Sequence, residues 1–338
     1  MSSNFQMKVG AGIAALAIVV AGGGYYFFHV RADSPDTAIK ATAKSIEKHD
    51  VTEFHRAVNV DSLLDSGYSG LVDGVTSFDN TMPPDARDAI KGFTEMLRDP
   101  MIITLKSAID SYVATGSLDP QKNVGVPEIV ERIGLNDVEI RNVKNIQRND
   151  ADRNEAFADV IIFQRELGRE FPLHIVLNRV EEEHWQITRV QNFQEYVAEI
   201  NQARRTQLED YLAKAVEINN RHDTAIREAE QKYGSILSTG NLGQDLTRDN
   251  LQTLFNEFIK PDWELRKQEL SALTVPKSAE PLHNLYMQIC DLSIDYAQDY
   301  ANWLEDKTID SIKSAEDKLH HAQALSSEAA DLAKRMTT

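Results

Sequence analysis

Two pairs of side chains near the C-terminus have the spacing of metal ligands. Glu280-x-x-His283 sets a carboxylate one helical turn before an imidazole, as in the di-iron sites of helical bundles, and Asp317-x-x-His320 is an imperfect copy. If the two helices reverse near residue 307, the histidines are offset by about eleven residues, roughly 16 Å along a helix. Metal ligands must each reach one ion at about 2 Å. The spacing therefore favours ordinary helix-terminal and solvated side chains over a metal site.

A second candidate resembles the start of a calcium-binding loop. Asp150-x-Asp152-x-Asn154 supplies oxygen ligands at alternating positions, but such a loop then needs glycine at its sixth position and glutamate at its twelfth. This chain has Glu155 and Ile161 there. A hairpin turn explains these polar residues better than a calcium site does.

The only cysteine, Cys290, lies between the apolar residues Ile289 and Leu292 in a helical pattern. A single thiol cannot form an internal disulfide, so we expect a small buried side chain. The sequence contains no glycine-rich phosphate loop, no Gly-x-Ser-x-Gly and no His-Glu-x-x-His. We therefore predict no catalytic residue, no cofactor and no metal.

From about residue 135 the apolar residues alternate, which indicates strands. Four such segments are 136–146, 155–166, 170–180 and 184–193. The turns between them are short and polar, so neighbouring strands are expected to be antiparallel.

Three residues of this region are candidates for a pocket inside the sheet. His174 lies in mid-strand, where it can point into a cavity as a base, with Phe163 and Trp185 as aromatic lining. The alternative is a half-exposed strand histidine with both aromatic side chains in the core.

Helices precede the strands. Ser34, Pro35 and Asp36 have the residue types of a helix start, and helical patterns continue to about residue 115 with an interruption expected at Pro100. Helices followed by an antiparallel sheet predict an α+β domain over residues 34–195.

The order of these segments resembles a known fold. The entry "EKHDVTEFHRAVNVDSLL" and the final strand "HWQITRVQNF" resemble the cystatin-like cone of the nuclear transport factor two superfamily. More narrowly, they are similar to uncharacterised bacterial proteins with one N-terminal membrane span before such a cone. The resemblance covers roughly residues 34–196 and implies helices packed on a curved antiparallel sheet. Enzymatic members use Asp, His or Tyr inside the cone, and these residues cannot be matched one by one here, so the resemblance implies no activity.

The sequence of residues 196–338 predicts an all-α helical bundle. Apolar residues recur there at alternating spacings of three and four, for example Leu282, Leu285, Ile289 and Leu292. Such stripes need a partner helix, which about four helices supply to one another. Pro261 is expected to bend one of them. The same helices are candidates for oligomerisation or for binding an unknown protein partner.

The N-terminal residues 9–28 carry no charge. Twenty helical residues span about 30 Å, the hydrocarbon thickness of a bilayer, which predicts a transmembrane anchor at 9–30 that binds the lipid bilayer. Residues 1–8 then form a short cytoplasmic tail, since Lys8 favours an N-terminus inside. A cleaved signal peptide ending near residues 30–32 is the main alternative, and a buried core helix is another.

The chain has 338 residues and a net charge of −17, which disfavours nucleic-acid binding. Together these patterns predict a single-pass membrane protein with an extracytoplasmic body and a non-catalytic binding or scaffolding role. One alternative is a ligand-binding or enzymatic cone, and another is assembly through the C-terminal helices.

Overall fold

The computed structural model describes residues 34–77, 84–117, 125–181 and 184–337. It is 71% helical and contains one small four-stranded antiparallel sheet. None of the helices in these ranges combines the length and the apolar composition that a membrane crossing requires. The predicted fold class, α+β with an N-terminal transmembrane helix, is therefore wrong. The structure is mainly helical with a small sheet, and the described residues contain no membrane-spanning helix. The predicted span at 9–30 and tail at 1–8 lie outside the described residues, and the anchor and single-pass topology are not retained.

The chain divides into two compact units, Met1–Ala203 and Arg204–Thr338. The sequence analysis divided it between residues 195 and 196, whereas the observed division lies within a single long helix, α7 (Phe193–Thr239). The other elements of the first unit are α2 (Asp36–Glu47), α3 (Val51–Ala57), α4 (Val60–Ser77), α5 (Pro84–Thr115), α6 (Val126–Arg132), β1 (Val138–Arg148), β2 (Glu155–Gln164), β3 (Arg169–Val180) and β4 (His184–Val190).

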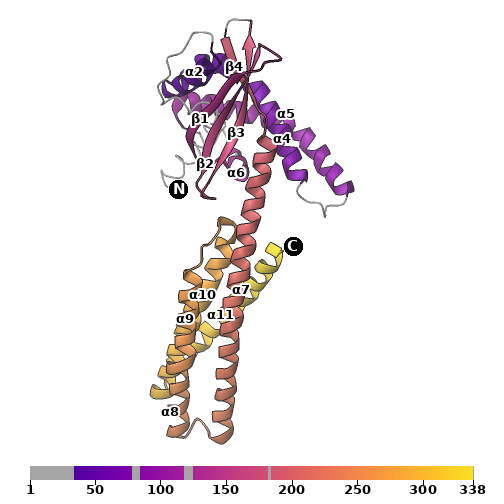
Figure 1. Cartoon of the computed structure of the whole chain (residues 1–338). Coiled ribbons are helices and arrows are strands. Elements are labelled where there is room, and N and C mark those ends of the chain that lie inside the picture. The colour runs from indigo at the N-terminus through magenta and orange to yellow at the C-terminus, as the bar shows by residue number, and fades with distance from the viewer. Residues whose placement is uncertain (1–33, 78–83, 118–124, 182–183, 338) are drawn as a thin grey trace. The chain divides into compact units, whose positions relative to one another are not determined.

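The sheet has the order β1-β2-β3-β4, as shown in Figure 1, so the four predicted strands are confirmed. Even-numbered residues of β2 are buried, and those from Ala156 to Ile162 pair with buried odd-numbered residues of β3, for example Val160 with Leu173. Helices α2, α3 and α4 contact β4, and one contiguous apolar core contains residues of these helices and of the sheet. The opposite face of the sheet carries half-buried and exposed residues and, in β3, the buried Val176.

One close backbone approach joins the start of α7 to this core. Gly134 has φ +72°, and a Cβ there would lie 2.9 Å from Cγ2 of Ile200. Its carbonyl accepts a hydrogen bond of 2.9 Å from the Tyr196 hydroxyl. Glycine is therefore required here both by its left-handed conformation and by the lack of space for a side chain.

Helix α5 is not interrupted at Pro100, contrary to the expectation from the sequence. A proline inside a helix removes one N–H donor, and here the carbonyl that loses its partner belongs to Met96. Both Met96 and Pro100 are exposed. Water can therefore satisfy that carbonyl, and the helix continues through the proline.

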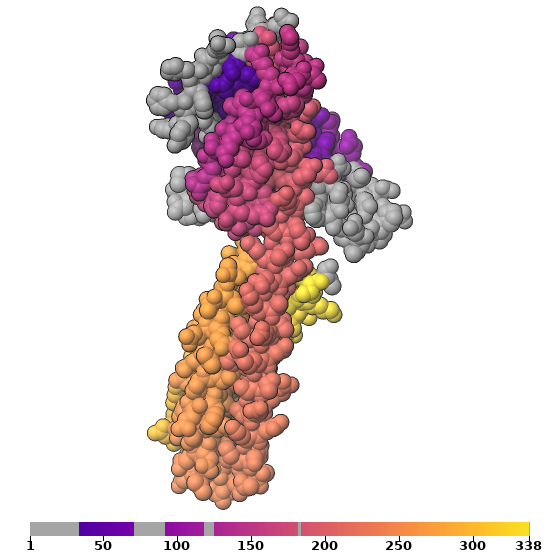
Figure 2. All heavy atoms as spheres, in the orientation of Figure 1, coloured from indigo at the N-terminus to yellow at the C-terminus, as the bar shows by residue number. Residues whose placement is uncertain are grey.

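The second unit is a bundle made by the later part of α7 and the segments that follow it. These are α8 (Asp245–Leu254), a π-helical turn (Phe255–Ile259), α9 (Lys260–Ser271), a short 3₁₀ turn (Lys277–Ala279), α10 (Glu280–Asp306) and α11 (Ile309–Thr337). The π turn ends at Ile259, two residues before Pro261. A proline inside a helix is one of the recognised causes of such a local change in helix geometry. Two buried apolar clusters hold these helices together. Figure 2 shows α7 packed beside the helices that follow it in this unit.

Helix α11 packs along α10. The buried residues of α11 are alanines seven positions apart, Ala315, Ala322 and Ala329. Asp299 of α10 accepts hydrogen bonds of 2.5 Å from the Ser314 hydroxyl and from the Lys318 ammonium of α11. The buried face of α11 thus consists of small side chains.

We therefore expect Ala322→Leu to lower the free energy of unfolding by about 2 kcal/mol, because Ala322 is 5% exposed and three extra carbon atoms overpack its surroundings. Ala324→Leu, at an exposed position of the same helix, should change it by less than about 0.5 kcal/mol. Urea unfolding followed by circular dichroism measures both. Equal midpoints for the two variants would show that Ala322 is not closely packed.

Candidate functional site

The three residues predicted for a pocket do not converge. Trp185 is 2% exposed and belongs to the core of the first unit. Phe163 lies on the opposite face of the sheet, with the Arg141 guanidinium 4.8 Å from its ring centre. His174 is exposed on that same outer face. The structure therefore separates Trp185 from the other two by the thickness of the sheet.

His174 is held on the outer face by a carboxylate. Its Nδ1 lies 2.6 Å from Asp159 Oδ1, and the other carboxylate oxygen accepts a 2.6 Å hydrogen bond from Asn145. Burial raises the pKa of Asp159, but these two hydrogen bonds and the charge of His174 outweigh burial and hold that pKa below its usual value. The pair orients one imidazole at the surface of the sheet and ties β1, β2 and β3 together.

The residues whose spacing resembles that of metal ligands make local structural contacts or are exposed. His283 lies against Tyr211, with Nδ1 3.3 Å from the hydroxyl, while His320 is exposed far along α11. The Asp152 carboxylate caps the β1–β2 turn by accepting from the Asn154 N–H at 2.9 Å. Within the described ranges, no three His, Cys, Asp or Glu side chains are grouped so that they can hold a metal ion.

Cys290 is 1% exposed, in the core of the bundle. Burial raises the pKa of its thiol to about 11. A thiolate is the reactive form of cysteine, so this side chain is placed to pack and not to react.

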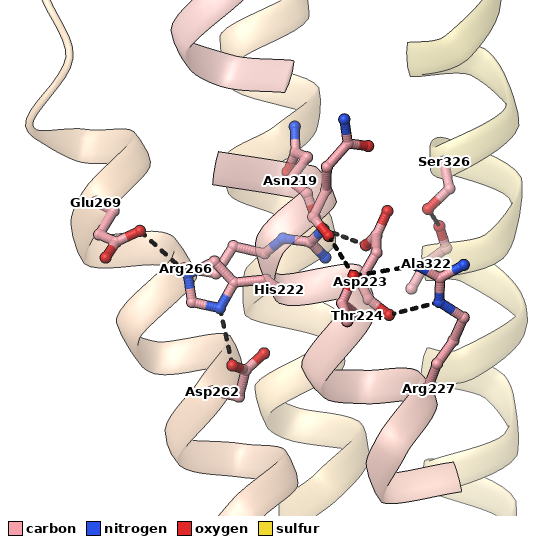
Figure 3. Close-up of polar contacts among 11 residues, drawn as sticks. Asn219, His222, Asp223, Thr224, Arg227, Asp262, Arg266, Glu269, Ala322 and Ser326 are labelled. Carbon is pink, nitrogen blue, oxygen red and sulfur yellow. Dashed lines mark hydrogen bonds and ion pairs between the residues drawn. The ribbon is translucent and has the colours of Figure 1, made fainter. Parts of the chain in front are cut away.

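A cluster of buried charged groups joins α7 to α9 in the helical unit. His222 of α7 is 3% exposed and lies between two carboxylates of α9, as Figure 3 shows. Its Nδ1 is 2.8 Å from Asp262 Oδ1, and its Nε2 is 3.1 Å from Glu269 Oε2. Ionised carboxylates only accept hydrogen bonds, so both contacts are satisfied together when both ring nitrogens carry protons. The imidazole thus bridges two carboxylates of α9.

Arg266 adds a buried guanidinium beside His222. Its guanidinium donates to the Asn219 carbonyl at 2.8 Å, pairs with Asp223 and stacks on the Trp263 ring at 4.5 Å. Its Nε atom, and Oδ2 of Asp262, are buried without a hydrogen-bond partner among the described residues. This polar cluster is therefore only partly satisfied.

Glu269 shows the electrostatic effect of the cluster. Burial raises the pKa of its carboxyl, but hydrogen bonds and charges from His222 and Arg221 outweigh burial and hold the pKa below its usual value. The carboxylate is therefore stabilised in its ionised form. Directional contacts of this kind fix which face of α9 meets α7, a role well attested for buried polar groups in helical assemblies.

The sequence analysis missed this cluster, although a signal is present. His222 occupies a position of the apolar stripe of α7, four residues after Ile218 and seven before Ala229. Arg266 does the same on α9, four residues before Leu270. A polar residue at a stripe position on each of two helices indicates that the two meet across the core.

The outer face of α5 is the second feature that the sequence analysis missed. Phe93, Met96 and Ile103 are 59%, 68% and 68% exposed. With the exposed Pro100 they follow spacings of three, four and three, which places all four on one face of the helix. This row of apolar side chains, called here the α5 apolar row, extends over about 15 Å of helix surface.

Comparison with known proteins identifies no relative. No family model, no curated protein and no solved structure matches this chain. The resemblance to a cystatin-like cone therefore stays a prediction, and function has to be argued from the surfaces and side chains described above.

Proposed function

We propose that this protein is a non-catalytic binding protein that holds a protein partner on the α5 apolar row. The observation that carries the proposal is the exposure of Phe93, Met96 and Ile103 on one helix face. Single exposed apolar side chains are common on protein surfaces, but contiguous rows mark interaction sites more often. Grooves of partner proteins receive helices through anchors with this same spacing.

The arrangement of reactive side chains supports a non-catalytic role. The histidines His55, His174 and His222 each contact a carboxylate within the protein, at 2.7 Å, 2.6 Å and 2.8 Å. Each of these contacts links two separate secondary-structure elements. Such side chains serve the packing of the fold, as the buried thiol of Cys290 does.

The first unit, and not the C-terminal helices, is therefore proposed as the binding module. The sequence analysis assigned a partner to the apolar stripes of residues 196–338. In the structure, these stripes pack against one another in the two cores of the bundle, where Leu282 and Leu251 are fully buried. The α5 apolar row has no such cover among the described residues.

Site-specific photo-crosslinking in the native cells tests the proposal. A photoreactive residue at Met96 in the full chain should give a discrete adduct with another polypeptide, identified by mass spectrometry. Phe93→Ser with Ile103→Ser should remove most of this adduct, because the two apolar anchors contribute about 1.5 kcal/mol each, which together is about 100-fold in affinity. The matched control is Leu246, which is 73% exposed in the second unit. The proposal would be contradicted if a photoreactive residue at Leu246 gave the same adducts, or if the two substitutions left the adduct yield at Met96 unchanged.

A further inference from the structure

The chemistry around the α5 apolar row specifies more than an apolar partner. Besides Phe93, Met96 and Ile103, the row contains one main-chain acceptor that helix geometry leaves open. Pro100 has no N–H, so the carbonyl of Met96 lacks the bond that residue i+4 supplies elsewhere in the helix. A partner that covers this row must place a hydrogen-bond donor opposite Met96, since burying an unpaired carbonyl is costly.

The charges beside the row are acidic. Among the described side chains of this part of α5, Arg98 pairs with Asp65 of α4, and the Lys106 ammonium lies 2.6 Å and 2.8 Å from the two carboxylate oxygens of Asp61. Glu95 is exposed, and the Asp99 side chain is 85% exposed, with the Arg98 guanidinium 3.7 Å from its carboxylate. A second copy of the chain would bring equal negative charges together, which opposes self-association through this face.

We infer that the partner is a basic amphipathic helix, in which an apolar stripe is flanked by lysine or arginine. This inference rests on the proposed function. The partner's stripe packs on Phe93, Met96 and Ile103, while its cations face Glu95 and Asp99. One of its long basic side chains donates to the open Met96 carbonyl, since lysine and arginine carry only donors.

Two synthetic peptides of about 18 residues test the inference, because this length covers the whole row. Both carry leucines at i, i+3, i+7 and i+10. One has lysine and arginine on the flanks, and the other has glutamate. Fluorescence anisotropy measures their binding to the full chain. We expect the basic peptide to bind about tenfold tighter than the acidic one at low salt, with a smaller difference at high salt.

Variants assign the binding to this face. Phe93→Ser with Ile103→Ser should weaken the basic peptide about 100-fold, while Glu95→Gln with Asp99→Asn should remove most of the preference for basic over acidic peptide. Leu246→Ser with Ile309→Ser is the matched control, because these two side chains are 73% and 69% exposed in the second unit. All substituted positions are exposed, and circular dichroism verifies that each variant is folded.

The possible outcomes separate the two proposals. If both peptides bind equally and both require Phe93 and Ile103, the partner is not specifically basic, yet the α5 apolar row still binds protein. If neither peptide binds, or if the row substitutions have no effect, the inference is overturned, while crosslinking at Met96 still decides the proposed function. A dimer of the full chain that Phe93→Ser with Ile103→Ser dissociates would show a second copy as the occupant, which also overturns the inference.

Discussion

Replacing His222 by leucine is expected to lower the free energy of unfolding of the helical unit by about 3 kcal/mol. The imidazole is 3% exposed and is the donor that Asp262 and Glu269 share. Its loss leaves two partly buried carboxylates facing an apolar side chain. Glu269 keeps Arg221 as a partner, which limits the loss. Urea unfolding, followed by circular dichroism and by the fluorescence of Trp263 and Trp303, measures the change.

A double variant distinguishes an ionic cause from a defect of packing. His222→Leu with Asp262→Leu removes the imidazole together with the carboxylate that depends on it most, and it should recover stability to within about 1 kcal/mol of the natural protein. His321→Leu, at an exposed histidine of α11, serves as the control and should have almost no effect. If the double variant is as unstable as His222→Leu alone, the cost arises from shape and not from unpaired charge.

The strands were predictable because strand composition and the polar turns between strands are local properties. Residues 156–163 are almost all apolar and lie between polar turns, and burial in β2 then alternates along them. The face of the sheet on which each side chain lies was harder to predict from the sequence. His174 and Trp185 both sit in strands with large apolar neighbours, and only the register between strands places them on opposite sides. The pocket prediction failed at this step.

Helical stripes were equally visible, but a stripe does not tell whether its partner lies in the same chain. Leu282 and Ile289 belong to a stripe that is buried by other helices of the bundle, whereas Phe93 and Met96 belong to one that is exposed. Both stripes have spacings of three and four. The difference arises from tertiary packing, so the sequence alone could not identify the exposed apolar face of α5.

Substituting Trp185 by alanine should lower the free energy of unfolding of the first unit by about 4 kcal/mol, because it leaves a large cavity in a packed core. Trp185 is 2% exposed, and its Nε1 has no hydrogen-bond partner among the described residues. Trp185→Phe should therefore cost much less, about 1.5 kcal/mol, since only volume is lost and no hydrogen bond is broken. Urea unfolding followed by circular dichroism compares both variants with the natural protein.

Phe163→Ala is the matched control on the other face of the sheet. That ring is half-buried beneath Arg141, so its removal should cost about 1 kcal/mol, the usual effect of a single substitution outside a packed core. A core role predicts this order of losses: Trp185→Ala largest, then Trp185→Phe, then Phe163→Ala. A pocket role predicts a different result, because an open cavity already lacks contacts on one side. Trp185→Ala would then lower the free energy of unfolding no more than Phe163→Ala does. Trp185 would in that case line a binding site, as the sequence analysis predicted.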